Sequence, residues 1–452
     1  MESTLAQASS LQGSRMIALL PHCGFLSETS RMLAIGKALV ELGHSVVFAT
    51  HGGPYAHVIE DCGFTLTQLE PHMDGARCEQ YLRDLVQIGR PGVRLQPPEE
   101  VRAGVQAEAS FFRTHGAELA VIGFTLTAYL SSRVVGIPLA SCHGGSYVPP
   151  VTELGLAPVP TQMPIPGTEW LPRAVKHWFA NTRTERMAGP VEFLNLVAAE
   201  LGVEPVPTLA SLMVSDLTLV TDVPEVLGVP KSVLEAWRPR RPAAYRVGTQ
   251  LIYTGPLFAQ LPLPVPEQVR GFLDGSRPTV YVVLSSGTPH LLRDVTHRVR
   301  AAGVRVIVGA TIHDFGPVDD PDILVAALLP SHTIMPCVDL VVGMGGQGTV
   351  QTAMATGTPM IGIPLHPEQE LNVSLAVRHG MGLALAPRHA PTESMTNAVR
   401  RILGDPEFRK QAQRVRGLYE GIDGARNAAA AIVRHLASAE SAPAPAPAPA
   451  AA

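Results

Sequence analysis

The sequence contains few cysteines and no long apolar run. Its five cysteines among 452 residues are odd in number and scattered, and no pair has C-x-x-C spacing, which argues against a disulfide framework and against a structural zinc site. No segment approaches the roughly 18 consecutive apolar residues of a membrane-spanning helix, and the polar start of the chain lacks the apolar stretch of a signal peptide. We therefore expect a cytoplasmic protein without an integral membrane segment.

An excess of one charge is also missing. The 35 basic and 39 acidic side chains leave a net charge of −4, and no long basic block occurs, so the sequence does not predict nucleic-acid binding. The G-x-S-x-G and H-E-x-x-H motifs are both absent from the sequence. Their absence excludes the commonest hydrolase and zinc-protease signatures.

The sequence does contain a repeated alternation of apolar runs and helical stretches. Short runs rich in Val, Ile and Leu begin at Met16 and Ser45 in the first half, and the pattern starts again at Thr279 and Asp339. Such runs alternate with amphipathic stretches of helical length, as in parallel sheets covered by helices on both faces. Because the chain is long enough for two cores, we predict an α/β protein of two parallel-sheet domains.

Proline-rich and low-complexity segments give the predicted boundaries. The Pro- and Arg-rich passage at 237–265 is interpreted as a linker, since proline fixes φ and removes backbone donors. A flexible N-terminal tail at 1–15 would precede the first domain at 16–236. The second domain would occupy 266–440, and its last helix could pack back on the first domain. The Ala/Pro tail at 441–452 is expected to be disordered.

The segment DLVVGMGGQGTVQTAMATG carries a G-x-G-x-x-G motif. The three glycines are Gly343, Gly345 and Gly348. A dinucleotide fingerprint normally follows the first strand of its domain, whereas this motif follows the predicted fourth strand. Glu368, about twenty positions on, lies in a predicted turn with Gln369 and Asn372, and this cluster of carboxylate and amide groups suits a polyhydroxyl ligand better than one ribose.

The same region resembles a known family. The segment GGQGTVQTAMATGTPMIGIPLHPEQELN, Gly345 to Asn372, is similar to the donor-binding signature of the UDP-glycosyltransferase superfamily, the GT-B enzymes of family one, in its bacterial macrolide and antibiotic form. YTGPLF from Tyr253 resembles the start of the family's second domain, and the Ser-Ser-Gly at 285–287 resembles its phosphate turn. Three motifs in order are more specific than one glycine motif. The resemblance implies the GT-B fold, two Rossmann-like domains facing a cleft.

The resemblance also implies a nucleotide-sugar donor site without a metal or a further cofactor. Backbone N–H groups of the glycine turn, at a helix N-terminus, can hold the donor's diphosphate, and an acid-Gln pair would hold the sugar hydroxyls. The donor-binding residues implied in this way are Ser285, Ser286, Gly345, Gly346, Gly348, Thr349, Thr352, Glu368 and Gln369.

Two positions depart from the family's pattern. Met344 stands where the family usually has a histidine that donates to the phosphates, and a methionine cannot donate. Thr352 stands where UDP-binding members commonly place a glutamate on the ribose hydroxyls. A dTDP-sugar, whose ribose lacks the 2′-hydroxyl, is therefore as plausible a donor as a UDP-sugar, while Gln369 favours glucose by resemblance only.

Transfer to a hydroxyl needs a general base near the acceptor, and the family places it just after the first strand of the N-terminal domain. This chain reads PHCGFLSETSRMLAIGKAL there, without the usual Gly-His pair. Counting back from the helix end gives Glu28, our first choice, and counting forward gives Phe25, with His22 nearby. Gly123 stands where the family has an aspartate that orients a histidine. The alternative is that Ser27 caps the helix and Glu28 only complements its dipole.

These features predict an inverting, metal-independent glycosyltransferase. It would move a hexose, glucose or a deoxysugar, from a UDP- or dTDP-sugar to a hydroxyl of a lipophilic small molecule held in the N-terminal domain. A catalytically silent relative that binds nucleotide sugar or assists a partner enzyme is the alternative. The acceptor, the sugar and the oligomeric state, for which a homodimer is one option, stay open.

Overall fold

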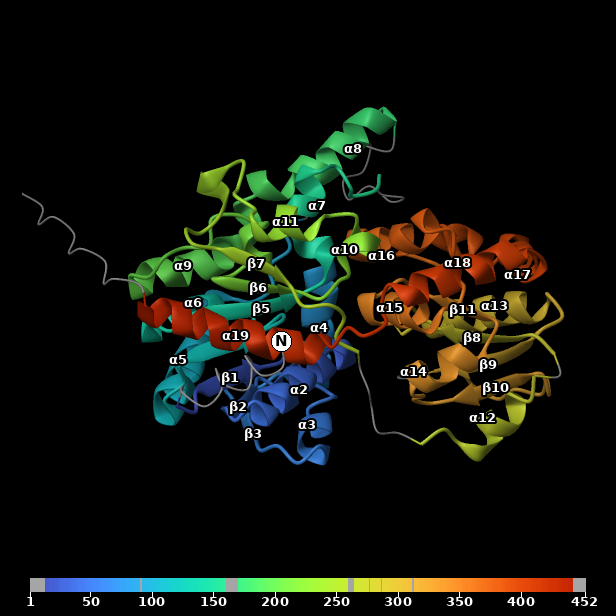
Figure 1. Ribbon diagram of the computed structural model, residues 1–452, viewed down its shortest axis with the longest axis horizontal. Helices are drawn as coiled ribbons and strands as arrows, with labels where there is room; N and C mark the ends of the chain where they lie inside the picture. Colours follow the sequence, from blue (N-terminus) through green and yellow to red (C-terminus); the bar gives the residue numbers. More distant parts are fainter. Residues whose placement is uncertain are drawn as a thin grey trace, which may run out of the picture.

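A computed structural model describes residues 13–89, 92–159, 170–258, 264–275, 277–285, 287–310 and 313–441. It contains two separate parallel sheets, one from each half of the chain (Figure 1). The first has seven strands in the order β3-β2-β1-β4-β5-β6-β7, and the second has six in the order β10-β9-β8-β11-β12-β13. The predicted α/β class, with two parallel-sheet domains, is confirmed.

The strands are short and most of them are buried on both faces. Those of the first sheet are β1 (Met16–Leu20), β2 (Ser45–Thr50), β3 (Leu66–Gln68), β4 (Leu119–Ile122), β5 (Leu139–His143), β6 (Leu217–Val220) and β7 (Gln250–Tyr253). Those of the second are β8 (Thr279–Val283), β9 (Arg305–Gly309), β10 (Ile323–Ala326), β11 (Leu340–Gly343), β12 (Met360–Gly362) and β13 (Gly382–Ala384). In β4 and β8 every residue is buried, which explains why both sequences consist almost entirely of apolar residues.

Helices cover both sheets. The first domain contains α2 (Leu26–Glu41), α3 (His57–Asp61), α4 (Gly75–Val86), α5 (Pro98–His115), α6 (Ala128–Val135), α7 (Pro149–Glu153), α8 (Arg173–Thr182), α9 (Glu192–Leu201), α10 (Pro224–Leu227) and α11 (Lys231–Glu235). The second contains α12 (Glu267–Phe272), α13 (Pro289–Arg300), α14 (Ser331–Ile334), α15 (Gln347–Thr356), α16 (Pro367–Arg378), α17 (Glu393–Gly404) and α18 (Pro406–Gly417), and α19 (Gly424–Ser441) follows. Short 3₁₀ helices lie at Gly145–Tyr147, Thr184–Arg186, Gly189–Val191, Ser211–Met213, Pro242–Ala244, Met335–Cys337 and Pro387–His389.

Helix α19 returns from the second domain to the first. Figure 1 shows it lying across the first half of the molecule, and it packs on α2 and β6. Ala428 and Ile432 of α19 share one buried cluster with Met32 of α2 and Ile17 of β1. The chain therefore crosses between the two domains twice.

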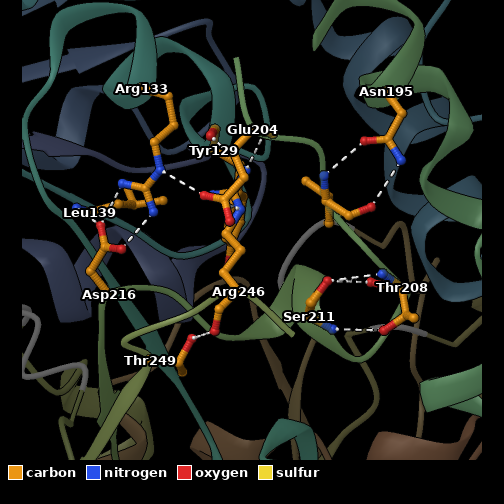
Figure 2. Close-up of polar contacts among 11 residues, drawn as sticks. Tyr129, Arg133, Leu139, Asn195, Glu204, Thr208, Ser211, Asp216, Arg246 and Thr249 are labelled. Atoms are coloured by element: carbon orange, nitrogen blue, oxygen red, sulfur yellow. Dashed lines mark hydrogen bonds and ion pairs between the residues drawn. The ribbon is translucent and has the colours of Figure 1, made fainter. Parts of the chain in front are cut away.

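Strand β7 lies inside the range predicted as linker. Gln250–Tyr253 pairs in parallel with β6 and forms the edge of the first sheet. The passage before it is also tied to the first domain: Figure 2 shows Arg246, which donates to the carbonyl of Tyr129 at 3.1 Å and forms an ion pair with Glu204. The Pro- and Arg-rich passage that suggested a linker is instead attached to the first domain and leads into its edge strand. The chain therefore passes to the second domain only after Tyr253. Residues 259–263 of the predicted linker lie outside the described residues.

Parts of the predicted tails lie outside the described residues. These are 1–12 at the start of the chain and 442–452 at its end. Within the described part of the chain, no helix combines the length and the apolar character needed to cross a bilayer.

Candidate functional site

The glycine-rich turn joins β11 to α15 in the second domain. Gly345 has a φ of +92°, and a Cβ atom added there would collide with Val373 of α16. A side chain is therefore excluded at Gly345. Beside Gly346, which precedes the first helical residue, no described atom beyond its chain neighbours lies within 4 Å of the Cβ position. Open space therefore borders the start of α15.

The first turn of α15 has no side-chain cap from its N-cap residue. The N–H groups of Gly348 and Thr349 lie in this turn, where a helix offers them no intrahelical acceptor, and the helix dipole adds partial positive charge. The N–H group of Gln347 donates to the carboxyl group of Glu368. The helix end thus already holds an acidic group of the chain itself, and such ends are the places where phosphate groups bind.

The other predicted donor-site side chains are engaged within the second domain. Thr352 donates its hydroxyl to the carbonyl of Gly348 at 2.7 Å. Glu368, in the first turn of α16, accepts from the amide of Asn372 at 2.5 Å. The side-chain oxygen of Gln369 accepts a backbone N–H of the preceding loop at 2.9 Å. Of the three, Glu368 accepts the N–H group of Gln347, the first residue of α15.

The predicted phosphate turn after β8 is described in part. Ser285 is exposed at the end of this strand, and Ser286 lies outside the described residues. Strand β8 pairs with β11, so its carboxyl end lies beside the glycine turn.

Helices α2 and α15 face each other where the two domains meet. Arg31 of α2 donates from Nη1 to the Oε1 atom of Gln347 at 2.6 Å. The Cβ atom of Ser27 lies 3.7 Å from the place that a Cβ atom on Gly348 would occupy. The amide of Gln347 donates in turn to the hydroxyl of Thr221 at 2.7 Å. Arg31 is 6% exposed, and its Nε atom has no hydrogen-bond partner among the described residues. A buried cation with an unused donor therefore lies beside the start of α15.

Three carboxyl groups lie within electrostatic reach of Arg31. Burial raises the pKa of Glu28 and of Glu368 to about 7, and that of Asp222 to about 6. In each case the charge of Arg31 acts in the opposite direction and lowers the pKa. Near neutral pH these groups are therefore partly protonated, which reduces the repulsion that an incoming anion would meet.

Glu28 is fully buried in the first turn of α2. Its Oε1 atom accepts the backbone N–H groups of His22 and Phe124, both at 2.9 Å, and its Oε2 atom has no hydrogen-bond partner among the described residues. The N-cap residue of α2 is Phe25, and it makes no side-chain cap bond. The alternative in which Ser27 caps this helix is therefore wrong.

The carboxyl group of Glu28 also explains a glycine. It fills the space in which a side chain on Gly123 would begin. The sequence comparison placed the family's orienting aspartate at Gly123. A carboxyl group does occupy that place, but α2 supplies it instead of the loop after β4.

His22 lies in the loop after β1, as predicted from the sequence. Its ring stacks on Tyr81, with 4.6 Å between the ring centroids. The backbone N–H of Gly24 donates to its Nδ1 atom at 3.3 Å, and its Nε2 atom has no hydrogen-bond partner among the described residues. Burial, with a smaller contribution from the neighbouring His51, lowers the pKa of His22 to about 4. The ring is therefore neutral near pH 7.

The sequence analysis did not single out His51 and Glu108. His51 directly follows β2, and its Nε2 atom lies 3.0 Å from Oε1 of Glu108 on α5. Glu108 is fully buried and also accepts the hydroxyls of Thr127 and, at 2.6 Å, Ser131. The available signals were a histidine at the end of an apolar strand and a glutamate in the apolar face of a helix. Nothing in the sequence indicated that they meet across 57 positions.

One small pocket connects these two histidines. It is lined by side chains and backbone at the carboxyl ends of β1, β2 and β4, with contributions from α4 and the loop before α5. Its lining includes His22, His51, Tyr81, Gln96 and Phe124. Glu28 holds the backbone of two residues that line this pocket, His22 and Phe124. Within the described residues, no group of three acidic, histidine or cysteine side chains is placed to hold a metal ion.

Comparisons with solved structures decide the fold. Spinosyn forosaminyltransferase SpnP superposes with a TM-score of 0.65 at 16% identity, over 94% of this chain and 100% of that one. The glycosyltransferase VinC, solved in complex with dTDP, superposes with a TM-score of 0.63 at 18% identity, again over 94% and 100%. The chain has the GT-B fold.

The second domain of this GT-B chain also matches a sequence family. Residues 299–421 match the family described as erythromycin biosynthesis protein CIII-like, C-terminal domain. The match includes the glycine turn and all of α16, and so it covers the Gly345 to Asn372 segment of the predicted resemblance. The motifs at Tyr253 and at 285–287 lie outside the matched residues.

Two of the curated relatives of this GT-B chain are mycobacterial proteins. The PGL/p-HBAD biosynthesis glycosyltransferase of Mycobacterium tuberculosis is 32% identical over 201 residues, 44% of this chain and 43% of that protein. The PGL/p-HBAD biosynthesis rhamnosyltransferase of Mycobacterium bovis is 25% identical over 329 residues, 71% of this chain and 68% of that protein. The chain thus spans less than half the length of the first of these relatives.

Proposed function

We propose that this GT-B protein is an inverting, metal-independent glycosyltransferase that moves a hexose, glucose or a deoxysugar, from a UDP- or dTDP-sugar to a hydroxyl of a lipophilic small molecule. The observation that carries the proposal is the start of α15, where free helical N–H groups border open space beside a buried arginine. The names of the relatives, a glycosyltransferase and a rhamnosyltransferase, and the dTDP bound by VinC support it.

The donor's diphosphate would lie at the start of α15. The N–H groups of Gly348 and Thr349 would donate to its oxygens, as helix N-termini do for phosphates. Arg31 would supply the charged donor that Met344 cannot, because its guanidinium already reaches Gln347 and its Nε is unused. The phosphate charge would then be neutralised by side chains and backbone of this chain.

The remaining predicted residues would select the donor. Glu368 is held at the helix start and would accept sugar hydroxyls, with Gln369 beside it. The hydroxyl of Thr352 already donates its hydrogen to the carbonyl of Gly348. Towards a ribose hydroxyl, the Thr352 oxygen can therefore act only as a hydrogen-bond acceptor. This arrangement gives no strong preference for a ribose with a 2′-hydroxyl, which keeps UDP and dTDP as equal candidates.

Transfer would proceed by in-line attack of the acceptor oxygen on the anomeric carbon. The diphosphate leaves toward α15 with the bonding electrons of the broken carbon–oxygen bond, and the acceptor's proton passes to a base of the first domain. The sequence predicts Glu28 first and His22 second as this base. Both lie at the carboxyl end of β1, at the edge of the first sheet that contacts α15.

The test is an assay with UDP-glucose and dTDP-glucose, in the presence of EDTA, against a panel of hydrophobic phenols and macrolides. We expect release of nucleoside diphosphate together with a gain of one hexose mass on an acceptor, and the faster donor identifies the nucleotide. Calorimetry with each nucleoside diphosphate runs alongside. If neither nucleotide binds, the assignment of the α15 turn is wrong.

The alternative is a silent relative that binds nucleotide sugar without turnover. Met344 in place of the family's histidine and Gly123 in place of its aspartate favour it. Nucleotide-sugar binding with no modified acceptor across the panel would support this alternative over transfer.

A further inference from the structure

The buried pair of His51 and Glu108 is not used by the chemistry described so far. Glu108 accepts three hydrogen bonds, from the imidazole and from the hydroxyls of Thr127 and Ser131. These three donors fix the position of its carboxylate. The carboxylate in turn fixes the orientation of the His51 ring, which is 8% exposed and lines the same pocket as His22.

The hydrogen bond to Glu108 determines where His51 carries its proton. A carboxylate that already receives two hydroxyl donors acts as an acceptor, so the Nε2 atom of His51 is the protonated nitrogen. Its Nδ1 atom then carries an unshared lone pair, and this atom is buried without a hydrogen-bond partner among the described residues. An imidazole held in this way by a carboxylate is oriented to accept a proton at its other nitrogen.

His22 has the opposite arrangement. Because the N–H of Gly24 donates to Nδ1 of His22, that nitrogen carries the lone pair and Nε2 carries the proton. The free atom of His22 is therefore a donor and cannot take a proton from a hydroxyl. Glu28 uses one oxygen to hold the backbone at His22 and Phe124, and it does not line the pocket.

We propose that His51, oriented by Glu108, is the catalytic residue that accepts the proton of the acceptor hydroxyl at its Nδ1 atom. The oxygen–hydrogen bond of the acceptor breaks, and its electron pair forms the bond to the anomeric carbon. Glu108 balances the positive charge of the resulting imidazolium. The Nε2–H of His22 donates to the acceptor oxygen before the reaction and orients it, and Glu28 is a positioning residue for the loop that carries His22.

This inference rests on the proposed function, and steady-state kinetics with an acceptor identified by the panel assay tests it. We expect His51→Gln to lower kcat by about 10²- to 10⁴-fold, the usual contribution of a general base, with the calorimetric affinity for nucleoside diphosphate unchanged. Glu108→Gln should lower kcat by a similar factor, because its amide would donate to Nε2 and move the ring proton to Nδ1. His57→Gln, an exposed histidine of the same segment, is the matched control with normal kcat.

Nitrogen-15 NMR of the histidine-labelled wild-type protein gives a readout that does not need turnover. We expect His51 to show a bare Nδ1 and a protonated Nε2, His22 to show the reverse, and Glu108→Gln to switch only the His51 pattern. A protonated Nδ1 in wild-type His51, or a His51→Gln variant with normal kcat, overturns the assignment of the base while leaving the transferase intact. Failure of the wild-type protein to modify any acceptor overturns the proposed function, and the base with it.

Discussion

The two sheets present different chemistry where the domains meet. At the carboxyl end of β11 the second domain offers backbone: a turn that only glycine can form at Gly345 and the free N–H groups of α15. At the carboxyl ends of β1 and β2 the first domain offers side chains, above all the imidazoles of His22 and His51, which carry buried nitrogen atoms without partners among the described residues.

Under the proposed function, this difference follows from the chemistry of the two ligands. A diphosphate is the same in every nucleotide sugar, so a fixed arrangement of backbone donors can serve many proteins of the fold. An acceptor hydroxyl varies in position and acidity, and side chains can be exchanged to meet it. We therefore expect substitutions on the two sides to impair different properties of the protein, and the following predictions test this, from the largest expected effect to the smallest.

Gly345→Ala should have the largest effect. The new methyl group meets Val373 and the carbonyl of Gln369 at 3.0 Å, in a backbone conformation that L-residues avoid. We expect the free energy of unfolding to fall by about 1–3 kcal/mol and the affinity for nucleoside diphosphate to fall by about 100-fold or more, because the turn must move. Chemical denaturation and calorimetry measure the two effects.

The neighbouring Gly346→Ala separates the two effects. Its φ is −58°, and its methyl group would enter open space. Unfolding should therefore be unchanged within about 0.5 kcal/mol, whereas nucleotide affinity should still fall if the diphosphate occupies that space. Unchanged affinity in Gly346→Ala would place the diphosphate elsewhere and remove the contrast between the two sides.

Arg31→Met tests the one place where a side chain of the first domain is proposed to serve the donor. Loss of a charged hydrogen bond should weaken nucleoside diphosphate binding by about 10- to 100-fold, and the effect should shrink for the free nucleoside, which lacks phosphates. Arg31→Lys keeps the charge but loses the planar fork and should give an intermediate affinity. Calorimetry with UDP, dTDP and the nucleosides measures this series.

A second substitution makes the Arg31 prediction specific. If Arg31 replaces the family's histidine, then Met344→His in the Arg31→Met background should recover affinity for the diphosphate. Met344 is 3% exposed, so stability of the double variant must be measured in parallel. A stable double variant without any recovery would show that Arg31 and residue 344 do not serve the same phosphate group.

The same contrast explains how much the sequence could predict. Most of the predicted donor-side residues lie within one stretch, Gly345 to Asn372, so the family resemblance of that stretch was enough to locate the turn, although it did not indicate Arg31. On the acceptor side, His51 and Glu108 come from a strand end and from the middle of α5. Their meeting depends on strand order β2-β1-β4 and on helix packing, which no local pattern specifies.

The boundary between the domains shows a related limit. Proline density correctly marked the absence of sheet before Gln250, but β7 itself is only four residues long and joins the sheet through β6. Its role as an edge strand depends on a partner that lies about thirty residues earlier. A short edge strand and an extended linker have the same local sequence pattern, so the boundary needed the structure.

Glu28→Gln should have the smallest effect, on stability as a function of pH. The folded pKa of Glu28 is raised by burial to about 7 from an ordinary value of 4.5, so the native state holds the proton more tightly than the unfolded chain. The stability that Glu28 contributes is full below its unfolded pKa and is lost as pH rises through the folded pKa. Between about pH 6 and about pH 8, wild type should therefore lose about 1 kcal/mol relative to the neutral glutamine variant.

Urea unfolding of both proteins across this range checks the prediction, with Glu99→Gln, an exposed carboxylate in the first turn of α5, as the control that should show no such trend. Glutamine keeps an oxygen for the N–H groups of His22 and Phe124, so the loop should stay in place and kcat should fall far less than in His51→Gln. If Glu28→Gln instead abolished transfer while His51→Gln did not, Glu28 would be the base that the sequence first suggested. The catalytic residue of the acceptor side would then also be predictable from one short segment after β1. The two domains would no longer differ in how far their site residues can be predicted from the sequence.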